Sequence, residues 1–165
     1  MKSLFTATFI LLLASTVMAQ DGQDGQDGQE AKDAQEIRAS IIKNNEETKK
    51  NLKLSKSQNS AKGSHDFWSS GGLLVDLSPE FTYEFDSYNL TPKHITIISL
   101  VPGKAAVAAY YNEGSFKPKN SAKVDHYLCR VSVVFVNENG QWKARHSHFS
   151  PVQGGSGTTQ TGADD

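Results

Sequence analysis

A predicted β-hairpin near the C-terminal end of the chain is the feature that most constrains its fold. Residues 131–136 are rich in β-branched and aromatic side chains, and residues 141–150 form a second strand-like run after Asn139-Gly140. An Asn-Gly pair supplies the two positive φ angles of a tight hairpin turn. In this register Glu138 pairs with Gln141, and Arg130 lies next to Phe149 unless a one-residue bulge changes the pairing.

The returning strand of this hairpin predicts a polar surface. Side chains alternate across a strand, so every second residue shares a face. One face then changes from apolar groups to imidazole and hydroxyl groups along the series Trp142, Ala144, His146, His148 and Ser150. We interpret this row as one wall of a pocket.

The chain has 165 residues, enough for one ordinary domain with a tail at each end. Residues 1–19 combine a lysine, an apolar run and small residues before a cleavage position, as in a secretory signal peptide. The Asp-Gly-Gln repeat within residues 20–30 predicts a flexible spacer, residues 31–152 the domain, and residues 153–165 a disordered tail. We therefore expect a secreted or periplasmic protein.

Charge and composition exclude several classes of partner. Lys and Arg number 17 and Asp and Glu 18, and the basic residues are scattered, whereas nucleic-acid binding needs them gathered on one surface. No segment after the signal approaches the ~20 apolar residues of a membrane span, so we expect neither a nucleic-acid nor a membrane partner. The single cysteine, Cys129, is expected as a small core residue, and we expect no cofactor.

Helix-forming residues come first along the domain and strands follow. Residues 31–57 lack Pro and Gly and carry apolar residues at helical spacing, and a second short helix is expected through residues 66–68. Residues 94–100 and 105–116 predict two strands joined by a type II turn at Val101-Pro-Gly-Lys104. This order predicts an α+β fold with N-terminal helices packed on the concave face of a curved antiparallel sheet.

Three segments resemble the nuclear transport factor 2-like superfamily, and within it the SnoaL-like group and the association (hub) domain of calcium/calmodulin-dependent protein kinase II. Gly103-Lys-Ala-Ala-Val-Ala-Ala-Tyr110 is similar to the family's strand after the glycine turn, and Arg130-Val131 to the start of its next strand. Gly140-Gln-Trp142 with His146-Ser-His148-Phe-Ser150 is similar to its closing strand. The resemblance extends over residues 31–151 and implies a cone-shaped α+β fold.

This resemblance implies several functions, because the fold hosts enzymes, binding modules and assembly modules. The hub domain binds small carboxylates with arginines and a histidine in its cavity. Arg130 stands at the position of one such arginine, whereas Asn112 replaces a second. The iota-type carbonic anhydrases also close with a His-rich strand that ends in Ser, and His146, His148 and Ser150 resemble that ending.

His146 and His148 permit two interpretations. Two residues apart on one strand, both imidazoles can reach one ion, and a zinc-type site would then need a third ligand from His94, Asp125 or His126. Alternatively, both histidines line a polar cavity or hydrogen-bond to the backbone at its rim. We expect the second arrangement and no metal.

Arg130 and Tyr110 complete the expected lining. Arg130 facing inward beside His148 would form an anion-binding corner, whereas at the rim it would pair with an acidic side chain in solvent. Tyr110 and Tyr111 take opposite faces of their strand, so one of them lies inside and can donate a hydrogen bond.

The sequence thus predicts a secreted SnoaL-like domain that binds a small polar or anionic ligand in a cavity lined by Tyr110, Arg130, His146, His148 and Ser150. One alternative is an enzyme, either a carbonic-anhydrase-like lyase or an isomerase. In that case His146 or His148 acts as general base, and Tyr110 or Arg130 stabilises developing negative charge. The other alternative is a homo-oligomeric assembly module, for which a homodimer is the largest assembly that we expect.

Overall fold

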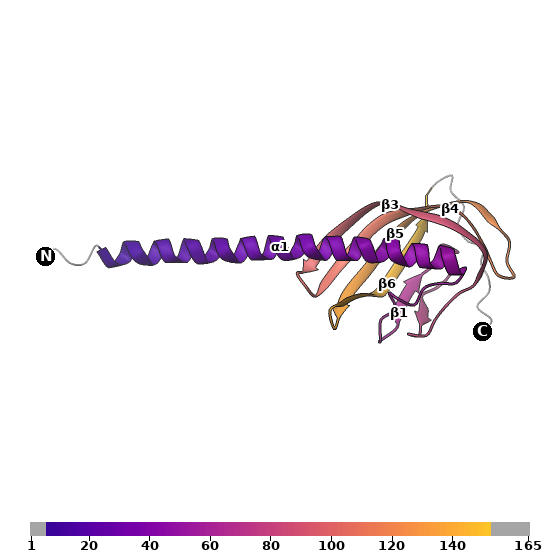
Figure 1. The fold of residues 1–165 in the computed structure, drawn as a ribbon, viewed down its shortest axis with the longest axis horizontal. Coiled ribbons are helices and arrows are strands. Elements are labelled where there is room, and N and C mark those ends of the chain that lie inside the picture. Colours follow the sequence, from indigo (N-terminus) through magenta and orange to yellow (C-terminus); the bar gives the residue numbers. More distant parts are fainter. Residues whose placement is uncertain (1–5, 153–165) are drawn as a thin grey trace.

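The computed structural model describes the backbone of residues 6–152 and the side chains from residue 25 onward. One long helix is followed by six strands: α1 (Thr6–Asn51), β1 (Ser64–Phe67), β2 (Val75–Leu77), β3 (Phe85–Val101), β4 (Ala105–Pro118), β5 (Val124–Glu138) and β6 (Gln141–Pro151). The strands form one sheet in the order β2-β1-β6-β5-β4-β3, antiparallel except for the β1–β6 pair. Figure 1 shows the second half of α1 lying across the curved sheet, while the first half extends beyond it. The expected α+β architecture is confirmed, with one helix on the sheet.

The part of α1 that covers the sheet has a single buried stripe. Buried side chains recur every three or four residues, at Asp33, Ile37, Ile41, Asn45 and Thr48. Ile37 and Ile41 pack in the main core with apolar residues of β4, β5 and β6, among them Phe135 and Trp142. Beyond Ile41 the buried residues of the stripe are the polar Asn45 and Thr48, so the C-terminal end of α1 brings hydrogen-bonding groups over the sheet.

A buried carboxylate attaches α1 to the turn between β3 and β4. Asp33 Oδ2 accepts a hydrogen bond from the Gly103 N–H at 2.6 Å, and Asp33 Oδ1 accepts one from Gln29 Nε2 at 2.7 Å. Gly103 has a φ of 72°, and the Lys104 N–H donates to the Val101 carbonyl at 2.9 Å. The expected tight turn is therefore present, and its glycine satisfies the position with positive φ.

The C-terminal hairpin begins as predicted. Asn139 and Gly140 have φ angles of 54° and 81°, and β5 pairs with β6 from Glu138 opposite Gln141 to Phe135 opposite Ala144. Arg145 then forms a β-bulge, so that the next pair is Val134 with His146, and Arg130 lies opposite Ser150 instead of Phe149. The bulge exchanges the two faces of β6 for all residues beyond it.

Two expectations for the N-terminal half differ from the structure. The short helix expected around Asp66 is wrong, because residues 64–67 form β1, whose backbone groups pair with β2 and β6. Pairing with strands distant in sequence has overridden the local helix signals. Helix α1 also includes the Asp-Gly-Gln tract, where a flexible spacer is predicted.

The domain boundaries stay predictions. Residues 1–5 of the expected signal peptide and the whole of the expected tail, 153–165, lie outside the described residues. No helix among the described residues is long and apolar enough to cross a membrane. Cys129 is 0% exposed in the second core cluster, which confirms it as a core residue.

Candidate functional site

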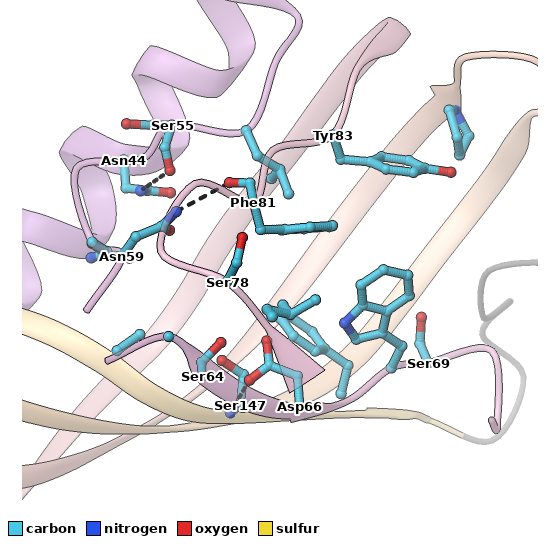
Figure 2. Close-up of a pocket in the computed structure, with 18 of the residues that line it drawn as sticks. Asn44, Ser55, Asn59, Ser64, Asp66, Ser69, Ser78, Phe81, Tyr83 and Ser147 are labelled. Carbon is cyan, nitrogen blue, oxygen red and sulfur yellow. Dashed lines mark hydrogen bonds between the residues drawn. The ribbon is translucent and has the colours of Figure 1, made fainter. Parts of the chain in front are cut away.

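A cavity lies between the C-terminal end of α1, the inner face of the sheet and the connecting segment 54–83 (Figure 2). One chamber has a volume of about 260 Å³ and adjoins a second of about 220 Å³. We name them the Asp66 chamber and the Tyr110 chamber after one residue of each. They share the wall residues Asn44, Leu54, Gln58, Phe85, Phe116, Tyr127, Ala144, Ser147 and Phe149. The two chambers therefore adjoin along a shared wall.

Asp66 places a buried carboxyl group in the wall of its chamber. The strand β1 lies parallel to β6 with Asp66 paired to Ser147, and Asp66 is only 6% exposed. Its Oδ1 accepts the Ser147 N–H at 2.8 Å, and Figure 2 shows Ser64 and Ser147 beside it. Burial raises the pKa of Asp66, and hydrogen bonds from Ser147 and Ser64 offset part of that rise. This carboxyl group therefore takes up a proton more readily than an exposed aspartate.

Aromatic rings form much of the wall. The Trp68 ring centroid lies 5.8 Å from that of Phe81 and 6.4 Å from that of Tyr83. Tyr83 in turn lies 5.5 Å from Phe85, and Phe116 lies 5.0 Å from Tyr127. These separations are typical of edge-to-face and tilted aromatic pairs. They give the site a continuous apolar surface that extends from the connecting segment to the sheet.

Phenol and amide groups characterise the Tyr110 chamber. The Tyr88 hydroxyl donates to Asn45 Oδ1 at 3.2 Å, and Asn45 Nδ2 donates to the Leu90 carbonyl at 3.0 Å. Burial raises the pKa of Tyr110, and the nearby Tyr88 raises it further, so Tyr110 stays neutral over the physiological range. Because Tyr110 points inward, its hydroxyl can donate a hydrogen bond to a molecule in this chamber.

The structure separates the five residues predicted to line the pocket. Tyr110 lines the cavity, and Tyr111 on the other face is 39% exposed, as expected from their alternation. The other four, Arg130, His146, His148 and Ser150, line neither chamber. They lie on the outer face of the sheet, so the prediction that the polar row continues the face of Trp142 and Ala144 is wrong.

The bulge at Arg145 explains this difference. The Ala144 N–H donates to the Gln58 carbonyl at 2.8 Å, and the Arg145 guanidinium donates to the Gly63 carbonyl. Within the connecting segment, Asn59 thus pairs with β6 at Ala144, and β1 pairs with β6 from His146 onward. The extra residue turns Ser147 and Phe149 into the cavity in place of the two histidines.

Arg130 does not form an anion-binding corner in the cavity. Its side chain is exposed, and Nη2 donates to Ser150 Oγ at 3.2 Å and to the Pro151 carbonyl at 3.4 Å. His148 and Arg130 are both on the outer face, whereas Tyr110 is inside. Of the arrangements expected for the enzyme alternative, the one with a histidine base and Tyr110 acting on one ligand in the cavity is therefore not assembled.

The histidines of β6 pack around an aromatic ring instead. The Phe67 centroid lies 6.0 Å from that of His146 and 5.6 Å from that of His148, and His146 Nδ1 is 2.5 Å from the His65 carbonyl oxygen. Within residues 25–152, whose side chains the structure describes, no group of three or more His, Cys, Asp or Glu side chains could hold a metal ion. The pair His146 and His148 thus has no third ligand in that part of the chain.

Asp66 and the aromatic wall are the site residues that sequence reasoning missed. Asp66 directly precedes Phe67 and Trp68 in a segment expected to be helical, and neighbouring residues of a helix do not lie on opposite faces as they do in a strand. The alternation of His65, Asp66 and Phe67 is the signal for a strand, with the carboxyl on one face and the ring on the other. Three residues are too few for that alternation to be decisive.

No protein-family model and no curated protein matches the chain in sequence. Among solved structures, it is similar to a protein of unknown function from Pseudomonas putida described as NTF2-like, that is, nuclear transport factor 2-like. That similarity has a TM-score of 0.53 at 14% identity and covers 80% of this chain and 97% of that one. The fold is therefore the nuclear transport factor 2-like fold, which confirms the resemblance at the level of the fold.

Two further solved structures that are similar to this chain are described as association or hub domains. A putative calcium/calmodulin-dependent kinase II association domain from Exiguobacterium sibiricum has a TM-score of 0.47 at 13% identity, over 72% of this chain and 89% of that one. The calcium/calmodulin-dependent kinase II (CaMKII) hub homology domain from Chlamydamonas reinhardtii has a TM-score of 0.41 at 18% identity, over 85% of this chain and 98% of that one.

Proposed function

We propose that this protein binds a small, largely apolar molecule in the cavity between α1 and the sheet. The observation that carries the proposal is the cavity itself, about 260 Å³ in its Asp66 chamber, with aromatic walls and a few convergent polar groups. Concave, mainly apolar sites with a small number of placed polar groups are the usual form of small-molecule sites. Asp66 and Tyr110 supply a hydrogen-bond acceptor and a donor in the two chambers.

The charges around the cavity argue against an anionic ligand. Among the described residues that line the two chambers there is no Lys, Arg or His, and Asp66 is the acidic one. A carboxylate or phosphate in this site would lose its hydration without gaining a cationic partner. The anionic part of the expected ligand class depended on Arg130, which lies on the other face of the sheet.

A neutral fluorescent ligand tests this function. N-phenylnaphthylamine is apolar and small enough to probe such a cavity, and its emission rises in apolar surroundings. We expect saturable binding with one site per chain, and energy transfer from Trp68, which lines the Asp66 chamber. Replacing Phe116 with Trp fills space shared by both chambers and should abolish binding without unfolding the protein. Absence of saturable binding to the wild-type protein would refute the proposal.

The proposal includes export through a secretory route, which the N-terminal residues support by their composition. Expressed with residues 1–19 in a secreting host, the protein should leave the cytoplasm and begin at Gln20. Intact mass and N-terminal sequencing of the exported protein measure this directly. Recovery of the full-length chain only from the cytoplasm would contradict it.

Association into a homodimer is a second function that a specific observation supports. Ile98, Leu100, Val101 and Tyr111 are 51%, 55%, 47% and 39% exposed, lie on β3 and β4, and line neither chamber. A second copy of the chain would cover this apolar strip. Sedimentation equilibrium should give the mass of two chains, reduced to one chain by Ile98→Asp but not by Ser87→Asp at the opposite end of β3. A wild-type monomer at all concentrations would exclude the homodimer.

A further inference from the structure

We propose that the cavity selects ligands that carry a protonated amine, with Asp66 as the counter-ion and the neighbouring aromatic rings around the cationic group. This inference rests on the proposed small-molecule binding and specifies the class of ligand. It begins from an imbalance of charge at the site, where a buried carboxyl group lines the cavity without a cationic side chain among the described residues of its walls.

The hydrogen bonds of Asp66 orient the carboxyl group but do not neutralise it. The Ser147 N–H holds Oδ1 at 2.8 Å, and the hydroxyls of Ser147 and Ser64 supply further donors. All of these donors are uncharged. His146 can carry positive charge and interacts with Asp66, but it lies on the outer face of the sheet and not in the cavity wall. A cationic ligand would therefore supply the opposite charge that the protein itself does not place in the cavity.

Aromatic rings in the same chamber favour a cation over a neutral donor. Trp68 contacts both Phe81 and Tyr83, and all three rings line the Asp66 chamber. Figure 2 shows Phe81 and Tyr83 reaching into the cavity on the side opposite Asp66. The faces of aromatic rings carry partial negative charge and attract ammonium groups, most strongly in the case of tryptophan. A carboxylate and several rings around one space form the pattern expected at a site for organic cations.

The remainder of the cavity sets the form of such a ligand. The wall shared by the two chambers contains Leu54, Phe85, Phe116 and Phe149, so an aromatic or aliphatic body can extend from the amine toward the Tyr110 chamber. Burial of that body supplies affinity through the removal of apolar surface from water. The charge at Asp66 supplies the selectivity between ligands of equal size and shape.

Three ligands of similar shape test the inference in competition with N-phenylnaphthylamine: naphthylmethylamine, naphthalenemethanol and the carboxylate of naphthaleneacetic acid. At neutral pH the first is a cation, the second is neutral and the third is an anion. Because a charge-assisted contact in a buried site is stronger than a neutral one, we expect the amine to bind at least about tenfold more tightly than the alcohol. We expect the carboxylate to bind more weakly than the alcohol.

The variant Asp66→Asn provides the decisive comparison. Asparagine keeps an oxygen that can accept the Ser147 N–H but removes the charge, so the fold should persist. We expect this variant to lose the preference of about tenfold for the amine while binding the alcohol as the wild type does. The control Asp76→Asn removes an acidic group from the adjacent strand β2, outside both chambers, and should keep the wild-type preference.

The possible results distinguish the selection of amines from small-molecule binding itself. If the alcohol displaces N-phenylnaphthylamine but the amine binds no more tightly, the selection of amines is wrong and small-molecule binding stands. An unchanged preference in Asp66→Asn also refutes the role of Asp66. If neither N-phenylnaphthylamine nor any of the three ligands binds the wild-type protein, both proposals fail.

Discussion

The two faces of the β5–β6 hairpin have different surroundings, although alternating residues of the same two strands form them. The inner face carries Phe135, Ser147 and Phe149 toward the core and the cavity, whereas the outer face carries Arg130 and His148 toward solvent. One inserted residue, Arg145, decides which part of β6 belongs to which face. The comparison shows that a polar row on a strand identifies a site only when the register of that strand is known over its whole length.

The largest expected effect concerns two adjacent residues of β5. Phe135 is 0% exposed in the main core, and Val134 beside it is half-buried on the outer face. Phe135→Ala should lower the free energy of unfolding by about 3–5 kcal/mol because it removes a buried ring and leaves a cavity. Val134→Ala should cost roughly 1 kcal/mol. Urea denaturation of both variants measures the difference, and equal losses would mean that the two faces are not distinct.

A second pair tests the faces beyond the bulge, where the structure departs from the prediction. Phe149 lines both chambers, and His148 is exposed on the outer face. Phe149→Ala should lower the free energy of unfolding by about 2 kcal/mol and weaken binding of N-phenylnaphthylamine. His148→Ala should change stability by less than about 0.5 kcal/mol and leave binding unaltered. The reverse result would mean that His148 faces the cavity and that β6 has no bulge at Arg145.

The smallest expected effect is a dependence of stability on pH that arises from Asp66. Because burial raises its pKa in the folded state, the protonated form stabilises the fold below the pKa of the unfolded chain, about 3.9. That contribution is lost as pH rises through the higher pKa of the folded state. Asp66→Asn should therefore gain stability relative to the wild type between acid and neutral pH, as measured by urea midpoints.

Glu138 supplies a contrast of opposite sign. The Ser60 hydroxyl and the Ala61 N–H donate to its carboxylate, and mainly the bond from Ser60 lowers its pKa. Its contribution is present above the pKa of the unfolded chain and is lost as pH falls through the lower pKa of the folded state. Glu138→Gln should therefore be less stable than the wild type at neutral pH, with a smaller difference in acid. If both variants followed one trend, the environments of the two carboxyl groups would be alike.

Much of the fold could be predicted because its signals are local. The Asn139-Gly140 pair determines the hairpin turn, since it accommodates two positive φ angles, and Gly103 does the same for the preceding turn. Ile37 and Ile41 at helical spacing predict that the second half of α1 packs on the sheet. Strand alternation likewise predicts that one of Tyr110 and Tyr111 points inward.

The candidate site required the tertiary structure because contacts between distant segments create it. Asp66 faces the cavity only because β1 pairs with β6. The two histidines face outward because of the bulge at Arg145, where the Gln58 carbonyl accepts the Ala144 N–H and the Gly63 carbonyl accepts the Arg145 guanidinium. Sequence alone determined the two hairpin turns, the part of α1 that packs on the sheet, and the alternation of side chains along β4, β5 and the first part of β6. The tertiary structure decided which alternating set faces the cavity, because a single unpaired residue in a ladder reverses every side chain after it, and only the neighbouring segments specify where that residue lies.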